Sequence, residues 1–444
     1  MLKNKYYRKL AEPYLYKNIQ VCSPNILSIP RLLLTLISRR ELSKHIRSFA
    51  LVTADEEIAR DAMNLSNEVL DIEVSHHLIE IVRQKLFRKS SIIEELIGKL
   101  VYPFRDPHFE LNWYLGVLNA ARSVDGSLAL VICLATNLEH LRLMNLSPEI
   151  TEAVCRVRWE RSIKGASSRV YPLHKLKSLN VVLGKKASIP ILTPVEALKV
   201  SGEGDIHNFQ RPRNGSEAAG TLRSLELRHI NLRSNHLHRM LALPAMHGIH
   251  HLKMRDVCVL GYDYNHLGEL LRVFLPSLKT FEWTGVGESW PPRRVRPFGS
   301  FEGFTQLEDL TINLEYIATY GHSIYDPPAP LLQPKQFFPD SLRALTIQNF
   351  PQTLLYDLHE TCVDSPSENY LLTTAASLGL SAFDLFVIPA EHNHTWPYYK
   401  EPDGEFLQEL LSGLRDVGTS MRIYFKVYGC DSLVYDSGCA AVGQ

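Results

Sequence analysis

A six-residue pattern that recurs along the chain constrains its fold more than any other feature of the sequence. The pattern is Leu, a charged residue, any residue, an apolar residue, any residue and a second apolar residue. Strict copies begin at Leu138, Leu176, Leu222, Leu278, Leu307 and Leu342, and looser copies begin at Ile46, Val195, Ile249 and Leu380. Because side chains of a strand alternate between two faces, each copy predicts a short strand with one apolar face.

The intervals between the copies indicate how these strands are organised. From Val195 to Leu307, the copies follow one another after 27, 27, 29 and 29 residues, and the later steps to Leu342 and Leu380 are longer. A chain with 45% apolar residues matches three apolar positions by chance roughly 40 times, so the near-equal steps carry more weight than the matches. A solenoid advances by one coil at a time, and L-x-x-L-x-L is typical of leucine-rich repeats. We therefore predict an α/β leucine-rich-repeat solenoid, with a curved parallel sheet, outer helices and irregular repeats of about 27–29 residues with insertions.

Segments between the expected strands have helical periodicity. Asn265–Phe274 places Leu267, Leu270 and Leu271 on one face, and Pro276 ends this segment before the next strand. The pattern favours coils in which a strand is followed by a helix. The alternative is a series of βα units in an ordinary α/β domain, although no glycine-rich strand-to-helix turn supports it.

The repeats divide the chain into expected parts. Residues 1–52 form an N-terminal cap with the first strand, 53–136 a helix-rich insertion or degenerate repeats, 137–428 the repeat region, and 429–444 a loose C-terminal tail. Within the cap, we expect a helix over Asn4–Ala11 that ends at Pro13, followed by a strand over Tyr16–Val21. Near the other end, we expect a helix over Glu405–Leu414 and a closing strand over Met421–Val427.

Charge and cysteine usage favour an ordinary folded protein of the cytoplasm or nucleus. Lys and Arg together number 48, as do Asp and Glu, so no global field attracts nucleic acid or anionic lipid. No uninterrupted apolar run approaches the roughly 18 residues of a membrane-spanning helix. The seven cysteines are scattered without a C-x-x-C pair, which is typical of thiols in a reducing compartment.

The sequence gives no positive sign of an enzyme, a cofactor or a metal. The histidines between His229 and His251 lack an H-E-x-x-H spacing or a neighbouring cysteine cluster, which favours surface histidines over a metal site. The segment Gly184–Ser188 resembles the end of a phosphate-binding loop, but Leu179 stands where that loop requires its first glycine. A catalytic site assembled from distant residues is the alternative left open.

Residues between the apolar positions of each strand should face outward and form a partner-binding surface. The candidates are His140, Arg142, Asn180, Lys199, Glu226, His251, Lys253, Glu282, Asp309 and Thr311. Both charge signs occur without a continuous basic stripe, which favours a protein partner over nucleic acid or a membrane. A basic, aromatic loop offers three further anchor candidates, Trp290, Arg293 and Arg294. The alternative for each residue is an ordinary solvated surface.

The N-terminal segment adds a resemblance to a known family. Tyr7–Ile19 resembles the part of fungal F-box/leucine-rich-repeat proteins in which the last F-box helix runs into the first strand. The following residues, Leu32–Ile37, Arg39–Leu42 and His45–Phe49, are similar to the helix and arginine-flanked loop that lead to the first repeat strand there. The resemblance implies a repeat solenoid that recognises the protein substrate of a ubiquitin ligase.

This sequence departs from that family at the F-box itself. Met1 falls within what would be the last F-box helix, so we expect the surface that docks on a Skp1-type adaptor to be missing from this chain. Adaptor binding is therefore expected only if an F-box is encoded upstream of Met1. The alternative is a free-standing leucine-rich-repeat scaffold without a link to a ubiquitin ligase.

Overall fold

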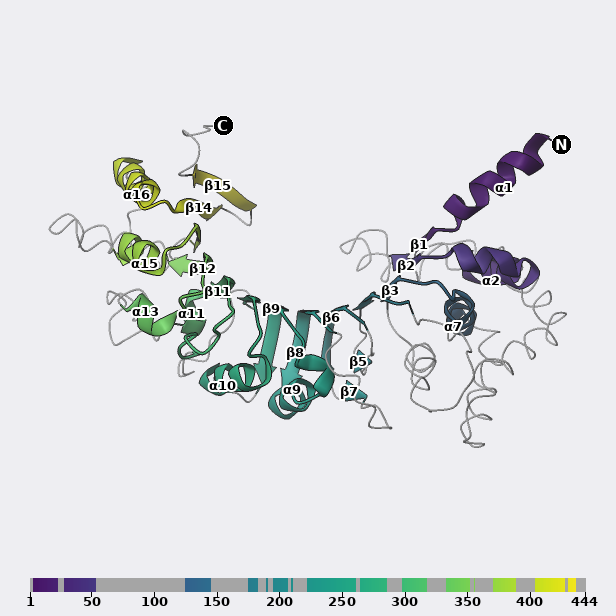
Figure 1. The fold of residues 1–444 in the computed structure, drawn as a ribbon, viewed down its shortest axis with the longest axis horizontal. Coiled ribbons are helices and arrows are strands. Elements are labelled where there is room, and N and C mark those ends of the chain that lie inside the picture. The colour runs from purple at the N-terminus through teal and green to yellow at the C-terminus, as the bar shows by residue number, and fades with distance from the viewer. Residues whose placement is uncertain are drawn as a thin grey trace, which may run out of the picture. The chain divides into compact units, whose positions relative to one another are not determined.

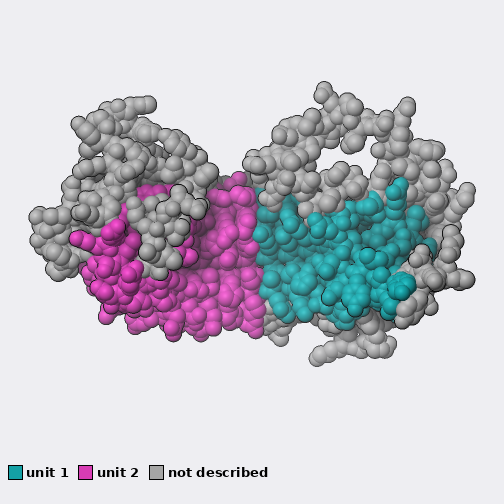
Figure 2. All heavy atoms as spheres, turned by 90° about the horizontal axis from the view of Figure 1, so that it is seen from above, with its two compact units in different colours: residues 1–222 teal, residues 223–444 magenta. Residues whose placement is uncertain are grey.

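The chain forms two compact units, Met1–Leu222 and Arg223–Gln444, which Figure 2 shows in different colours. The computed structural model describes residues 3–22, 28–52, 124–144, 175–182, 189–190, 195–206, 209–210, 222–260, 264–285, 298–317, 333–351, 355, 370–388, 404–427 and 430–436. The boundary between the units lies inside the 137–428 region. Most of the expected 53–136 part, residues 53–123, lies outside the described residues.

Unit 1 contains a parallel sheet with the strand order β1-β2-β3-β4-β6. These strands are β1 (Asn18–Cys22), β2 (Ser48–Val52), β3 (His140–Met144), β4 (Ser178–Val182) and β6 (Ala197–Ile206). The helices are α1 (Lys3–Leu15), α2 (Ser28–Ser38), a 3₁₀ helix over Arg40–His45, and α7 (Val124–Leu134), and α2 packs on α7. A separate short pair joins β5 (Ile189–Pro190) to β7 (Phe209–Gln210).

Unit 2 contains strands in the order β8-β9-β10-β11-β12-β13-β14-β15, all parallel to their neighbours except β15. The strands are β8 (Ser224–Arg233), β9 (His251–Leu260), β10 (Thr280–Thr284), β11 (Asp309–Asn313), β12 (Ala344–Pro351), β13 (Ala382–Ile388), β14 (Ser420–Val427) and β15 (Cys430–Asp436). The helices are α9 (Ser234–Leu241), a 3₁₀ helix over Pro244–Met246, α10 (Tyr264–Phe274), α11 (Leu314–Ile317), α13 (Pro334–Phe337), α15 (Tyr370–Leu378) and α16 (Gly404–Asp416). Within this unit, the helices lie on one side of the sheet (Figure 1). The prediction of an α/β chain with a parallel sheet and helices beside it is confirmed.

Each copy of the six-residue pattern occupies the same place relative to its strand. The first Leu lies two residues before the strand, as Leu278 does before Thr280, and is buried. The middle apolar position is also buried and stacks on its equivalent in the next strand. In unit 2 this row, in register throughout, consists of Leu225, Leu252, Phe281, Leu310, Leu345, Phe383 and Met421. The apolar face of strands β8 to β14 therefore meets the core beneath the helices.

Helices α15 and α16 end in the same way before their following strands. Gly379 and Gly418 have φ values of 61° and 78°, a left-handed conformation that glycine adopts without steric cost. The next residue then donates its backbone N–H five residues back, from Leu380 to Ala375 and from Thr419 to Leu414. These caps turn the chain from each helix into β13 and β14.

The two ends of the chain differ from the expectation. Helix α1 continues past Pro13 to Leu15, because Pro13 lies in its last turn and Tyr16 still donates to the Glu12 carbonyl at 3.0 Å. The prediction that the helix ends at Ala11 was therefore wrong. The prediction of a loose tail was also wrong for residues 430–436, which pair antiparallel with β14. An added strand hydrogen-bonds the backbone edge that β14 would otherwise leave open.

A buried aromatic cluster joins three successive coils of unit 2. Phe281 belongs to β10, Phe298 and Phe301 precede β11, and Phe338 follows α13, before β12; all four are fully buried. Phe301 lies at the centre, with ring centroids 4.5 Å from Phe298, 6.1 Å from Phe338 and 6.3 Å from Phe281. Aromatic side chains therefore fill this part of the core, where each ring buries a large apolar area.

Three strands carry a left-handed residue at the same coil position. His229, Asp256 and Asn349 have φ values of 51°, 51° and 54°. Each lies just before an apolar residue that returns to the core, such as Ile230. Asn, Asp and His tolerate this conformation better than other non-glycine residues, which accounts for the residue types found.

The left-handed corner at Asp256 gives a testable prediction. We expect Asp256→Gly to be more stable than Asp256→Val by about 1–2 kcal/mol, because glycine has no Cβ that clashes at positive φ. Both variants remove the exposed side-chain contact with His229 (3.3 Å), so the difference between them reports the backbone. Urea denaturation followed by circular dichroism measures it. The same two substitutions at strand residue Asp309 should give the opposite order, and equal stability at Asp256 would contradict the prediction.

Candidate functional site

The face of the unit 2 sheet that points away from the helices carries polar side chains in rows that run across the strands. We call it the outward face. Its first row consists of Ser224, His251, Thr280, Asp309, Ala344, Ala382 and Ser420. Its second row consists of Glu226, Lys253, Glu282, Thr311, Thr346, Asp384 and Arg422. The period-two alternation of each strand places these residues opposite the core.

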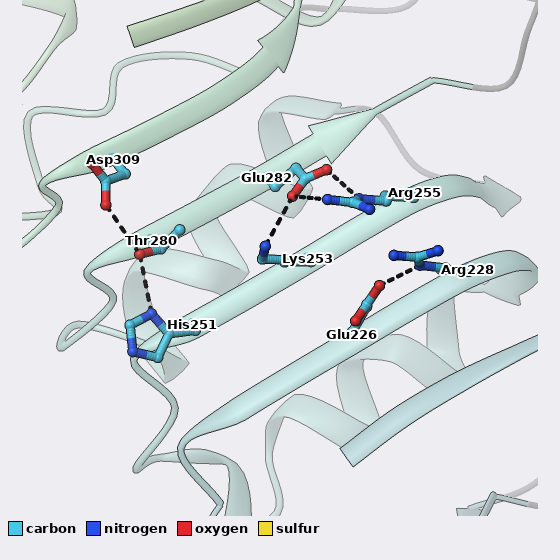
Figure 3. A network of polar contacts seen from close by, with 8 residues as sticks. All are labelled: Glu226, Arg228, His251, Lys253, Arg255, Thr280, Glu282 and Asp309. Atoms are coloured by element: carbon cyan, nitrogen blue, oxygen red, sulfur yellow. Dashed lines mark hydrogen bonds and ion pairs between the residues drawn. The ribbon is translucent and has the colours of Figure 1, made fainter. Parts of the chain in front are cut away.

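Glu282 is the centre of a charged cluster on this face (Figure 3). Its carboxylate accepts hydrogen bonds from Nε of Arg255 and, at 2.8 Å, from Nη2 of the same side chain. Lys253 Nζ lies 3.5 Å from Oε2 of Glu282, the oxygen that also accepts from Nη2 of Arg255. The Glu282 side chain is only 12% exposed, and these partners compensate the carboxylate for lost contact with water. Its hydrogen bonds in turn raise the pKa of Arg255 above the ordinary value.

Three further polar contacts extend the cluster along neighbouring strands. Glu226 accepts from Nε of Arg228 on the same strand. On the first row, the imidazole Nδ1 of His251 lies 3.1 Å from Oγ1 of Thr280, which donates to Asp309 at 3.5 Å. These two contacts connect β9, β10 and β11 (Figure 3). The charged half of the outward face is thus held in place by contacts within itself.

The other end of the outward face combines an arginine with two aromatic rings. Arg422 forms a two-point ion pair with Asp384, at 3.0 and 2.6 Å, and its guanidinium carbon lies 5.9 Å from the Tyr424 ring centroid. Tyr424 stacks on Phe386 with centroids 4.4 Å apart and planes 7° from parallel. Both rings are only partly buried. This flat patch can take up apolar or planar groups of a partner.

In unit 1, the corresponding polar positions form shorter rows. Arg142, Asn180 and Lys199 occupy one register row over β3, β4 and β6. Oδ1 of Asn180 is buried, with no hydrogen-bond partner among the described residues. His140 Nδ1 lies 3.0 Å from Oγ of Ser178. One residue before the strands, Glu139 accepts at 3.0 Å from both Arg47 and Lys177.

The Glu139 cluster predicts a pH dependence of stability. The hydrogen bond from Lys177, aided by the charges of Lys177 and Arg47, lowers the pKa of the Glu139 carboxyl below its ordinary value of 4.5. A carboxyl whose pKa is lower in the folded chain stabilises it above the unfolded pKa and loses that effect as pH falls through the folded pKa. We expect Glu139→Gln to lower the melting temperature most near neutral pH and least below about pH 4. Glu302→Gln serves as the charge-matched control, and a difference from wild type that grows on acidification would contradict this assignment.

All ten strand candidates from the sequence lie on the side of their strands that is opposite the core. Some of these side chains contact one another. Lys253 contacts Glu282, and His251 reaches Asp309 through Thr280. Thr311 follows in the second row, whereas His140, Arg142, Asn180 and Lys199 belong to unit 1. The loop candidates Trp290, Arg293 and Arg294 lie outside the described residues.

Several residues of the outward face were missed by the sequence analysis. They are Arg228, Arg255, Asp384, Phe386, Arg422 and Tyr424. The first two follow the end of the six-residue pattern, because β8 and β9 are longer than the pattern. A signal was present, since an arginine occurs six residues after both Leu222 and Ile249.

The histidine-rich stretch does not converge on one point. His229 faces Asp256, His250 Nδ1 lies 2.7 Å from the Gly248 carbonyl, and His238 packs against the Phe274 ring. Among the described residues, no three His, Cys, Asp or Glu side chains are grouped closely enough to hold a metal ion. None of the described helices is long and apolar enough to cross a membrane.

Comparison with known proteins adds no family. No family model matches the chain, and no curated protein matches it either. The function of this chain is therefore inferred from its own residues and their contacts.

Proposed function

We propose that this chain is a leucine-rich-repeat solenoid that binds another protein through the outward face. The proposal of leucine-rich repeats is supported by the six-residue pattern and by the parallel strand at each copy. It is also supported by the buried row of apolar residues that runs from Leu225 to Met421. The 27- and 29-residue steps fit this repeat class. In such a fold, a curved sheet presents its polar face as an extended binding surface.

The observation that carries the binding role is the composition of the outward face. Charges of both signs occupy one half and are held by contacts within the face, as Glu282 is by Arg255 and Lys253. The other half adds the Arg422, Tyr424 and Phe386 patch. Arginine and tyrosine are enriched among the residues that contribute most to protein interfaces, and pre-positioned side chains lose less entropy on binding.

Paired substitutions on the two sides of unit 2 test this proposal. Full-length protein is immobilised and the partners it retains are identified by mass spectrometry. The double variant Thr311→Arg/Thr346→Arg adds bulk to two neighbouring positions of the outward face. The matched control, Thr305→Arg/Thr373→Arg, makes the same chemical change at exposed positions outside that face. We expect the wild-type protein and the control variant to retain a partner protein that the Thr311→Arg/Thr346→Arg variant does not retain. Loss only in the control would exclude the outward face.

The resemblance of Tyr7–Phe49 to F-box/leucine-rich-repeat proteins extends the proposal to a substrate-recognition role in a ubiquitin ligase. A purified Skp1-type adaptor is mixed with this chain and with a version that carries the sequence encoded upstream of Met1. Adaptor binding by the extended version supports the ligase role. Failure of both to bind leaves a free-standing repeat scaffold as the function.

A further inference from the structure

Two arginines occupy adjacent positions on the outward face. Arg228 of β8 and Arg255 of β9 are partners in the register of the two parallel strands. Neighbouring strands lie about 4.8 Å apart, so two positive groups are held close together (Figure 3). The side chains are 32% and 35% exposed, so both are accessible to a ligand.

Each guanidinium is anchored by a carboxylate of the same face. Arg228 uses Nε to reach Glu226, and Arg255 uses Nε and Nη2 to reach Glu282. A guanidinium has five N–H donors in a fixed plane, so anchoring through one edge leaves further donors. The Nη groups of Arg228 and Nη1 of Arg255 have no acceptor among the described residues. The anchoring carboxylates thus fix the orientation of donors that remain available.

The juxtaposition of positive groups suits an anion at this point. Lys253 lies on the same face, two residues before Arg255, and its side chain is 39% exposed. Arg228, Lys253 and Arg255 bring three positive charges to the outward face. Glu226, Glu282 and Asp256, the neighbour of Arg255, balance them, so the excess is local to the two adjacent arginines and not a net charge of the cluster. Like charges on neighbouring strands repel each other, and an added anion between them relieves that repulsion.

The surroundings limit what kind of anion fits. Glu226 and Glu282 flank the arginine pair, and Asp309 lies on the next strand beyond β10. A continuous phosphate backbone laid along this face would meet these carboxylates and be repelled. A peptide can place one or two carboxylates on the arginine pair and neutral groups elsewhere. Charge complementarity therefore selects an acidic protein segment over nucleic acid.

We propose that Arg228 and Arg255 form a recognition site for Asp or Glu side chains of an acidic segment in the protein partner. This inference rests on the proposed protein-binding function and names the partner chemistry. Arginine is suited to this role because its planar fork binds a carboxylate through two parallel hydrogen bonds. Lys253 adds electrostatic attraction for the carboxylate but cannot form the two parallel hydrogen bonds.

Fluorescence anisotropy with a defined probe tests the proposal. The probe is a short fluorescein-labelled peptide in which Asp and Glu alternate with Gly and Ser. A matched peptide has Asn and Gln at the acidic positions. We expect full-length wild type to bind the acidic peptide at least about tenfold more tightly than the amide peptide, with affinity that falls as salt is added. No measurable preference for the acidic peptide would overturn the proposal.

Substitutions locate the binding. Arg228→Gln and Arg255→Gln should each weaken binding of the acidic peptide by about tenfold, whereas Arg239→Gln, the same change at an exposed position of α9, should not. Arg228→Lys keeps the charge and the ion pair but lacks the fork, so it should bind with intermediate affinity. If Arg255→Gln perturbs folding by leaving Glu282 poorly paired, Arg228→Gln decides the question. Equal binding by Arg228→Gln and Arg239→Gln, or tighter binding of an oligonucleotide of equal charge, would overturn the inference.

Failure of the acidic-segment site can be distinguished from failure of protein binding by the outward face. If Thr311→Arg/Thr346→Arg abolishes capture of a protein partner while Arg228→Gln leaves it unchanged, the outward face still binds a protein. Only the recognition of an acidic segment then fails. If neither variant affects capture, the proposed function fails with it.

Discussion

Replacing Phe301 with alanine should lower the free energy of unfolding by about 3–5 kcal/mol. The Phe301 ring is fully buried and lies within 6.3 Å, between centroids, of Phe281, Phe298, Phe304, Phe337 and Phe338. Removing it leaves a cavity between three coils, which the surrounding rings can close only in part. Urea denaturation followed by circular dichroism measures the loss.

Two variants bracket the effect of Phe301→Ala. Phe301→Leu retains most of the apolar volume and should cost less than Phe301→Ala, because the remaining cavity is smaller. Glu302→Ala alters the exposed neighbour and should change stability by no more than about 0.5 kcal/mol. A loss for Phe301→Ala similar to that for Glu302→Ala would show that the ring does not help to hold the coils together.

Leu345→Asp should destabilise the chain by more than about 4 kcal/mol, because it buries an unpaired charge. Leu345 is 1% exposed in the middle of β12, stacked between Leu310 and Phe383. No lysine or arginine is buried among the described residues, so an aspartate there has no cation in the core to pair with. The Asp side chain would be neutralised or would unfold its coil, and either response lowers the melting temperature strongly.

The adjacent residue provides the control for Leu345→Asp. Thr346 lies on the outward face of the same strand and is partly exposed. Thr346→Asp should cost about 1 kcal/mol or less, since its carboxylate remains in contact with water; repulsion from its register partner Asp384 accounts for part of that cost. Similar losses for the two variants would mean that the strand does not separate a core face from an outward face.

Much of the framework of this protein followed from local sequence. The period-two alternation of Leu138–Leu143 and its relatives identified the strands, because an apolar face must be buried wherever the alternation occurs. The same alternation assigned the candidates from His140 to Thr311 to the polar side of their strands. The helices over Tyr264–Phe274 and Gly404–Asp416 were also predicted, to within a few residues, from their apolar periodicity and turn signals.

The sequence by itself determined which residues each strand turns to the core, since burial of apolar side chains depends on a pattern that is local. Only the tertiary structure decided which polar side chains meet, because Arg255 and Glu282 are 27 residues apart and become neighbours through strand register. Register also aligned Arg228 with Arg255 and placed Cys430–Asp436 against β14. Such contacts depend on packing between coils, and no local pattern records them.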